Sequence, residues 1–263
     1  MNKIPFISAI VLLIGFIPVG YCANLADPTV LFPVGRFAVA GSYDLGGYTI
    51  TNDSVPCIMN RLHASLTYSP FSFLNIGFDL GATQMDVAAD TTPQDTIGIF
   101  HGDYGFSGGL HVKIGSDFFY DGLFRFIGIC QATYFSTSSA NGTLYSGKDA
   151  AGVVGLQFHV PQFGYVSAGP QLYLIEGENK SYNSSIKNPY SNVNNLRGWL
   201  AIDYFPQDKL MTGNKLFFSI EISVSPTVAF DKRAPLQEAS ISISLGSITK
   251  RLFGEESEID WTP

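Results

Sequence analysis

Apolar and polar residues alternate along most of this chain, and the alternation is clearest between Cys57 and Val87. Two alternating runs lie there on either side of Ser69-Pro70-Phe71, which we predict to be a tight turn. A period of two is typical of a β-strand whose two faces meet different environments. Both runs are longer than the ~5–6 residues usual for a strand in a soluble protein. The stretch therefore predicts a β-hairpin of long strands with one apolar face.

The same alternation recurs from Arg36 to Leu245 and predicts an all-β chain of about ten strands. The predicted strands are Arg36–Tyr48, Cys57–Tyr68, Leu74–Val87, Tyr104–Ile114, Leu123–Phe135, Ala150–Val160, Tyr165–Glu176, Leu196–Tyr204, Leu216–Val224 and Ala239–Leu245. Pro170 and Pro226 fall within or near the end of predicted strands, where each removes a hydrogen-bond donor from the ladder. We expect a β-bulge at both prolines.

Tight turns alternate with longer polar connections between these strands. The polar connections are Thr51–Ser54, Ala88–Gly98, Ser136–Gly147, Glu178–Asn192 and Asp231–Pro235. Bacterial single-chain membrane barrels have an even number of strands, short turns on the periplasmic side and longer loops on the outside. We therefore expect the polar loops outside the cell, and the tight turns and both termini in the periplasm.

Composition favours a membrane barrel over a soluble one. Charged residues make up 14% of the chain, against ~25% in an average soluble domain, and aromatic residues make up another 14%. Many aromatic residues lie near predicted strand ends, as in the two girdles of a transmembrane barrel. The rival architecture is a soluble barrel or sandwich, in which the same alternation has inside and outside exchanged. Strand length, low charge and the girdles favour the membrane.

In these features the chain resembles the small outer-membrane β-barrel proteins of bacteria. The resemblance covers nearly the whole mature chain and rests on pattern, not on a specific motif. It implies a single closed antiparallel transmembrane β-barrel with an up-and-down meander, located in the cell outer membrane as a monomer with the lipid bilayer as its partner. The formal net charge of −7 gives no electrostatic basis for binding nucleic acid.

The two ends of the chain are expected to lie outside the barrel domain. Residues 1–23 have the form of a secretory signal peptide, with Lys3 as its positive region and Ile7–Ile17 as its apolar core. That core is shorter than the ~20 residues of a membrane-spanning helix. We assign residues 24–253 to the barrel domain and residues 254–263 to a periplasmic tail.

If the apolar faces meet lipid, the polar faces of the strands enclose the interior. The ionisable side chains on the polar faces are Arg61, His63, Asp79, His111, Lys113, Arg125, His159, Arg197, Asp203 and Glu221. Opposed residues in a hairpin have a constant index sum, about 140 for the first hairpin and about 418 for the turn before the ninth strand. These sums predict lumen ion pairs between Arg61 and Asp79, Arg197 and Glu221, and Asp203 and Lys215. A ten-stranded barrel is only slightly wider than the filled eight-stranded one, so we expect these charges to neutralise one another in a filled interior.

No motif in the sequence predicts a catalytic centre, a metal site or a cofactor. The omptin proteases are ten-stranded barrels with an Asp pair and an Asp–His pair near the outer rim, and His101-Gly102-Asp103 puts an imidazole and a carboxylate on one strand face. No matching acid pair occurs on an opposite strand, however, and the omptin spacing is absent. The histidines also lack metal-ligand spacing of the HExxH kind.

We therefore predict a non-enzymatic outer-membrane barrel with a side-chain-filled interior and a structural or surface-interaction role. The ligand of its loops stays open. One alternative is a narrow, porin-like passive channel for small solutes, lined by the interior charges. A second alternative is an omptin-like outer-membrane protease. Conductance across a bilayer separates the first two functions, and an assay with a peptide substrate addresses the third.

Overall fold

The computed structural model describes residues 28–50, 55–88, 100–180, 187–192, 195–206, 215–225 and 238–249. Its strands are β1 (Phe37–Ile50), β2 (Val55–Phe71), β3 (Leu74–Val87), β4 (Phe100–His101), β5 (Gly105–Gly115), β6 (Phe124–Ser138), β7 (Leu144–Val160), β8 (Gly164–Lys180), β9 (Lys187–Ser191), β10 (Leu196–Tyr204), β11 (Lys215–Val224) and β12 (Ala239–Ile248). Among these residues, no helix is long and apolar enough to cross a membrane. The predicted signal peptide, the predicted tail, two predicted loops (Thr51–Ser54 and Asp231–Pro235) and Pro226 lie outside the described residues.

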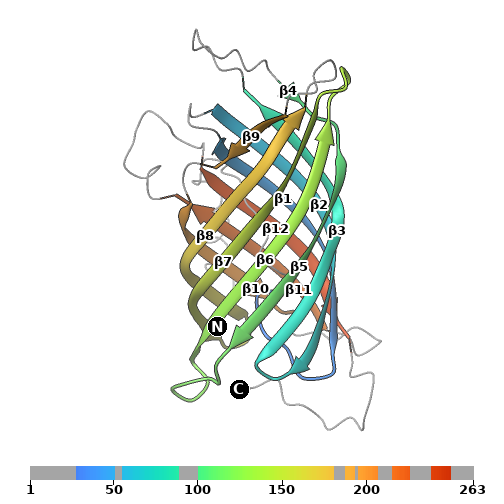
Figure 1. Cartoon of the computed structure of the whole chain (residues 1–263). Coiled ribbons are helices and arrows are strands. Elements are labelled where there is room, and N and C mark those ends of the chain that lie inside the picture. The colour runs from blue at the N-terminus through green and yellow to red at the C-terminus, as the bar shows by residue number, and fades with distance from the viewer. Residues whose placement is uncertain are drawn as a thin grey trace.

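The antiparallel sheet closes on itself to form a barrel. β1 pairs with β12 as well as with β2, and β10 pairs with β8 as well as with β11. The short strands β4 and β9 extend the wall beside β3 and β8, so ten of the 12 strands form the closed ring. These ten strands follow one another in chain order, which confirms the predicted meander. Figure 1 shows them running obliquely around the ring.

The two ends of the barrel differ in their connections. We call one the turn end, because β2–β3, β5–β6 and β7–β8 are joined there. β1 begins and β12 ends at the turn end, where Ala38 lies opposite Ile248. We call the other the loop end, and β4 and β9 lie there (Figure 1). The expectation that the loop end faces outward from the cell stays a prediction.

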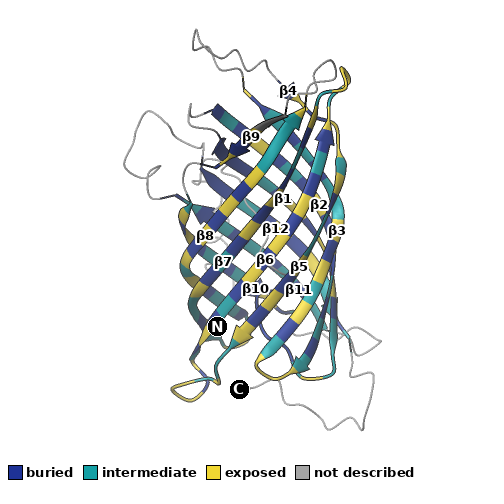
Figure 2. Ribbon diagram, viewed as in Figure 1, coloured by how far each residue is buried: buried dark blue, intermediate teal, exposed yellow. Residues whose placement is uncertain are grey.

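Inward and outward residues alternate along every long strand, as the sequence predicts. Figure 2 shows the resulting bands of buried and exposed residues. On β3, Phe78 is 42% exposed and points outward, whereas its neighbour Asp79 is 4% exposed and points inward. Leu110 on β5 is 68% exposed. The outer face is thus an apolar band encircling the barrel, whereas a soluble monomer rarely exposes a continuous apolar patch larger than a few hundred Å².

This combination of closure and an apolar exterior places the chain across a bilayer. A closed barrel pairs its backbone polar groups internally and has no open sheet edge, which is the condition for β-structure in hydrocarbon. Apolar outward and mainly polar inward faces are the pattern of outer-membrane barrels. The predicted outer-membrane location and fold class are therefore confirmed.

The first hairpin turns later than the sequence suggested. β2 continues through Pro70 to Phe71, and Ser72 and Phe73 form the turn. The register shifts between Tyr68 and Phe71, which accommodates the missing proline N–H next to the strand end. Pro170 behaves differently from our expectation, because β8 keeps one register with β7 on both sides of it and no bulge forms.

Several strands extend beyond the ends that we predicted at the loop end. β6 and β7 leave only residues 139–143 between them, although Ser136–Gly147 was predicted to be a loop. The predicted loop Glu178–Asn192 likewise contains the end of β8 and the whole of β9. Beyond the membrane the outward face meets water, so a strand there no longer needs apolar residues on that face. The polar composition of these segments therefore did not exclude strands.

Arginine substitutions at two outward leucines should show where the hydrocarbon lies. Leu110→Arg in the middle of β5 is expected to lower the free energy of unfolding by ~2–4 kcal/mol, whereas Leu144→Arg at the loop-end start of β7 should cost ~0–1 kcal/mol, because the cost falls towards the interfaces. The measurement is a denaturant titration of folding in lipid vesicles. Equal and small costs at both positions would mean that the outer face does not contact lipid.

Candidate functional site

The interior is the candidate functional site, and three groups of side chains fill it. Near the loop end lies a cluster of apolar and aromatic residues, which we call the aromatic layer. Charged and hydroxyl side chains make up the middle, the polar layer. At the turn end a strand-free segment of the chain, Pro28–Phe32, enters the barrel, and we call it the inner segment. All five of its residues are buried.

Two histidines in the polar layer cross β3 to reach the strand beyond it. His111 on β5 lies opposite Gly77, and its Nε2 is 2.8 Å from the hydroxyl of Thr67 on β2. His63 on β2 lies opposite Gly81, and its Nε2 is 2.7 Å from the hydroxyl of Ser107 on β5. Since glycine has no side chain, each imidazole can lie flat over the β3 backbone. The sequence therefore needs glycine at both crossing points.

Each imidazole also faces a carboxylate. His111 Nδ1 is 2.9 Å from Asp79 Oδ2, which also accepts a hydrogen bond of 3.2 Å from Gln131 Nε2. His63 Nδ1 is 3.7 Å from Asp44 on β1, and Ser242 of β12 donates to the same carboxylate.

The order carboxylate, imidazole, hydroxyl is that of a nucleophilic active site. The hydroxyl-bearing residues Thr67 and Ser107, however, are both fully buried in this structure. A substrate could reach neither hydroxyl without displacing the packing around it. These two sets of side-chain contacts link β1, β2, β3, β5 and β12 here.

The crossing glycines should be intolerant of a methyl group. A Cβ at Gly81 would lie 2.5 Å from Cδ2 of His63 and closer still to a carbonyl oxygen of β2. Gly81→Ala should therefore cost ~1–3 kcal/mol through overpacking. Gly41→Ala on the outward face is the matched control, because nothing lies within 4 Å of its Cβ position. Thermal or denaturant unfolding in vesicles measures both, and equal costs would contradict the crossing geometry.

The ion pair of the polar layer spans the lumen. Arg61 on β2 bonds to Asp149 on β7, with both side chains at least 96% buried. The Arg61 guanidinium also lies 5.6 Å from the ring centroid of Phe135. Our prediction missed Asp149, because we placed the start of its strand after it, at Ala150. Asp149 lies on the same inward face as Ala151 and Val153, which are also buried. Extending the period of two back from Ala151 by one step would have identified it.

The predicted cross-strand ion pairs are wrong, although the predicted faces are right. Arg61 lies opposite Thr83, and Asp79 lies opposite Ser65. Glu221 lies opposite Ala201 and Asp203 opposite Ser219, so neither faces its predicted partner, Arg197 or Lys215 respectively. In both hairpins the observed index sum is four higher than the prediction. In the first hairpin the reason is that the turn is formed by Ser72 and Phe73 and is not centred on Pro70. An even shift keeps each residue on its face but moves its partner.

The remaining predicted site residues have other neighbours. The Arg197 guanidinium lies 4.8 Å and 5.0 Å from the ring centroids of Tyr48 and Tyr173 and donates to Ser240. Glu221 accepts a hydrogen bond of 2.9 Å from Nε1 of Trp199. Lys215 is partly exposed at the turn end, with its ammonium 5.5 Å from the ring centroid of Phe205.

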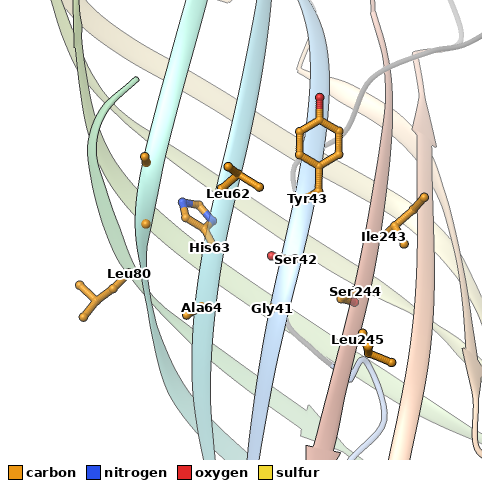
Figure 3. A pocket seen from close by; sticks show the side chains of 12 residues that line it. Gly41, Ser42, Tyr43, Leu62, His63, Ala64, Leu80, Ile243, Ser244 and Leu245 are labelled. Carbon is orange, nitrogen blue, oxygen red and sulfur yellow. The ribbon is translucent and has the colours of Figure 1, made fainter. Parts of the chain in front are cut away.

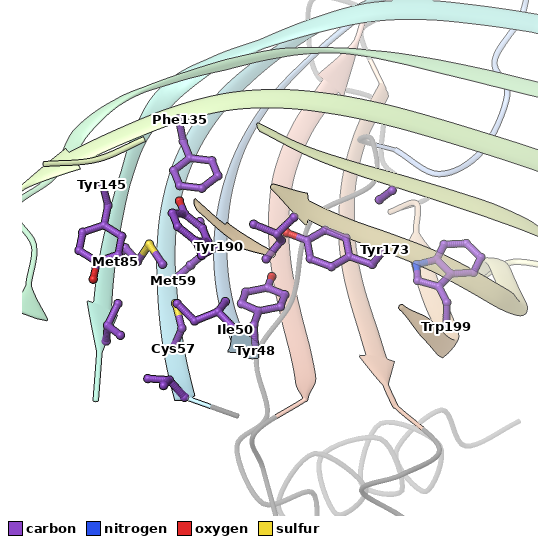
Figure 4. Packing of buried hydrophobic residues seen from close by; sticks show 14 of the residues in the cluster. Tyr48, Ile50, Cys57, Met59, Met85, Phe135, Tyr145, Tyr173, Tyr190 and Trp199 are labelled. Atoms are coloured by element: carbon purple, nitrogen blue, oxygen red, sulfur yellow. The ribbon is translucent and has the colours of Figure 1, made fainter. Parts of the chain in front are cut away.

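The aromatic layer closes the loop half of the interior. Tyr48 and Tyr173 stack across the lumen with ring centroids 5.1 Å apart. Figure 4 shows these two rings facing each other, with Trp199 beyond them. The aromatic members of the layer are Tyr48, Phe100, Phe135, Tyr145, Tyr173, Tyr190 and Trp199. None is more than 5% exposed, so water does not surround these rings.

The inner segment was not foreseen from the sequence. It begins at the first described residue and reverses direction at Gly35, whose φ of 76° suits glycine, before β1 starts. Val30 and Phe32 pack with residues of β1, β11 and β12 at the turn end. A segment that is neither strand nor helix has no periodic pattern of apolar residues. The only signal of burial in this sequence is that its apolar residues lie next to a proline.

A shallow hollow of about 650 Å³ lies on the outer face of the barrel. Small residues (Gly41, Ala64 and Ala82) form its floor, and Figure 3 shows Leu62, Leu80, Ile243 and Leu245 around it. Because this face meets the bilayer, lipid chains are its natural contents.

The rim histidine considered for proteolysis, His101, and its neighbour Asp86 point away from the interior. His101 Nδ1 lies 3.5 Å from Asp86 Oδ1, and the His101 side chain is 80% exposed. Asp86 lies between Met85 and Val87, which are both buried in the interior, so its own side chain faces outward. Among the described residues, no group of three or more His, Cys, Asp or Glu side chains is arranged to hold a metal ion.

No protein-family model and no curated protein sequence matches this chain. Among solved structures, the translocator domain of the autotransporter NalP from Neisseria meningitidis is similar, with a TM-score of 0.50 and 12% identity over 86% of this chain and 92% of that one. The outer-membrane protease OmpT from Escherichia coli gives a TM-score of 0.41 and 10% identity over 85% and 99% of the two chains. At such identities the NalP similarity concerns the fold alone. By its closed ring and apolar exterior, the chain is a small outer-membrane β-barrel of the bacterial type.

Proposed function

We propose that this chain is a closed, non-enzymatic outer-membrane barrel that acts through the surface at its loop end. The observation that carries the proposal is the filled interior. From the stacked Tyr48 and Tyr173 through the Arg61–Asp149 pair to the inner segment, the inward side chains are buried. A lumen in this state offers neither a continuous water path for solutes nor space for a substrate beside the buried hydroxyl groups.

The loop end supports a role at the surface. β7, β8 and β9 continue the wall past the middle of the apolar band, and their outward face there carries exposed charged residues. Lys148 on β7 and Glu176 on β8 form an ion pair of 3.4 Å with side chains 74% and 67% exposed. Paired strands hold this projection more rigidly than single loops would, which suits a surface that binds a partner.

A bilayer recording of the purified full chain tests the proposal against the passive channel. We expect insertion without a steady current, because the aromatic layer and the inner segment block the lumen in series. A variant with Tyr48→Ala, Tyr173→Ala and Trp199→Ala, in which residues 28–34 are also replaced by a Gly/Ser linker, is the positive control for insertion and should conduct. A steady current from the unmodified chain would replace the proposal by the channel.

The enzymatic alternatives are tested on the same preparation. A fluorophosphonate probe that labels nucleophilic hydroxyl groups should leave Thr67 and Ser107 unmodified, and peptide substrates should not be cleaved. Labelling of either residue that disappears in His111→Ala or His63→Ala would overturn the non-enzymatic assignment. Peptide cleavage that is lost in His101→Ala would instead favour a protease at the rim.

A further inference from the structure

The turn-end mouth of the barrel contacts the inner segment in the way that a receptor contacts a peptide. The segment pairs with no strand, and its hydrogen bonds run instead to side chains of the wall. Lys113 of β5 donates to the carbonyl oxygen of Pro28, and Ser69 of β2 donates to that of Phe32 over 2.8 Å. Arg125 of β6 reaches the carbonyl oxygen of Leu31 at 3.5 Å. These contacts are made to the backbone of the segment, at three of its five residues.

Two side chains of the inner segment add specificity. The Thr29 hydroxyl donates to the carboxylate of Asp203 on β10, and the Thr29 backbone N–H donates to the same carboxylate over 3.2 Å. The ring of Phe32 is buried at the turn end with its centroid 5.5 Å from the Lys113 ammonium. The wall residues Lys113 and Asp203 are themselves 1% and 0% exposed.

The inner segment can leave without breaking the barrel. Every strand of the ring keeps both of its neighbours when residues 28–34 are removed, because none of these residues takes part in a ladder. If the inner segment leaves the barrel, the side-chain hydrogen bonds to the wall and the apolar contacts of Val30 and Phe32 are lost. A loss of this kind is reversible, and it would leave a preformed site of two cations, one carboxylate and an apolar floor.

We propose that the turn-end mouth is a binding site for a short peptide segment and that Pro28–Phe32 is its tethered ligand. The class of ligand is an uncharged segment with a hydroxyl residue that donates to Asp203 and, three positions later, an aromatic residue that lies beside Lys113. The same site takes such a segment in trans once the tethered copy is out. This inference does not depend on the proposed function, because peptide binding is measured without reference to current.

The test uses the full chain with residues 28–34 replaced by a Gly/Ser linker of equal length. A fluorescein-labelled peptide covering residues 26–35 is titrated into the folded variant and into the unmodified chain, and fluorescence anisotropy is recorded. We expect saturable binding to the linker variant and at least about tenfold weaker binding to the unmodified chain, whose site is occupied. A peptide of scrambled sequence that binds the linker variant equally well would overturn the proposal, as would the absence of saturable binding.

The contact between Thr29 and Asp203 provides a matched pair of variants. A peptide with Thr29→Val should bind the linker variant about tenfold more weakly, since a hydrogen bond to a charged group is lost. When the linker variant also carries Asp203→Asn, the Thr and Val peptides should differ much less. If the linker variant with Asp203→Asn still prefers the threonine peptide as strongly, Asp203 does not recognise the Thr29 side chain, and the proposed site is wrong.

A second design covers the case in which the linker variant does not fold. A protease site inserted between Pro33 and Arg36 of the otherwise unmodified chain is cut after folding, which leaves the ring intact. The cut segment should stay bound and then exchange for the labelled peptide in excess. Immediate loss of the segment with no uptake of labelled peptide would overturn the proposal.

Discussion

Replacing either partner of the Arg61–Asp149 pair should lower the free energy of unfolding by ~3–5 kcal/mol, because the other partner is left as a buried charge without compensation. Both side chains are at least 96% buried and they meet across the lumen from β2 and β7. The variants are Arg61→Met and Asp149→Leu, measured by denaturant titration in lipid vesicles. The double variant should recover most of the loss, since two apolar groups of similar size need no partner.

The neighbouring residue Lys148 supplies the control. It points outward and pairs with Glu176 at 3.4 Å, in contact with water. Lys148→Ala should cost under ~1 kcal/mol, as is usual for an exposed ion pair. A coupling energy between Arg61 and Asp149 that is equally small would mean that water screens the pair. The interior would then be wet, and the closed-barrel function would lose its main support.

The features that the sequence predicted are those decided by local alternation. Period two assigns each residue to one face regardless of what lies opposite, so Arg61 and Asp79 were correctly predicted to point inward. The number of strands follows from the same pattern. The apolar faces of the strands are the ones that meet lipid, because hydrocarbon tolerates few ionised groups and the charged side chains lie mainly on the other faces.

Which side chains contact one another inside the barrel depends on information that no local sequence pattern contains. Register is set by the turn, and the proline at residue 70 drew the predicted turn of the first hairpin two residues too early, which moved the predicted partners of Arg61 and Asp79 by four positions. Contacts across the lumen, such as Arg61 with Asp149, depend on where the ring closes. The crossing of β3 by His63 and His111 was equally hidden, although Gly77 and Gly81 at a spacing of four, on either side of Asp79, are a visible trace of it.

Tyr173→Ala is expected to be as costly as breaking the ion pair, at ~3–5 kcal/mol, which is typical for truncating a large buried aromatic residue. Tyr173 is 1% exposed and stacks on Tyr48, with the Arg197 guanidinium 5.0 Å from its ring centroid. The truncation leaves a cavity and removes a ring that contacts a buried cation. Tyr134→Ala, which removes a ring 52% exposed on the outer face of β6, should cost much less. Unfolding titrations of both variants in vesicles give the comparison.

The same substitution separates the two blocks of the lumen. Tyr173→Ala together with Tyr48→Ala removes the stacked pair from the aromatic layer but leaves the inner segment in the turn end. Two constrictions in series pass ions only when both are open, so this double variant alone should remain closed. Adding the linker in place of residues 28–34 should then produce a current. If the double variant conducts without the linker, the inner segment does not seal the turn end, and the aromatic layer alone keeps the barrel shut.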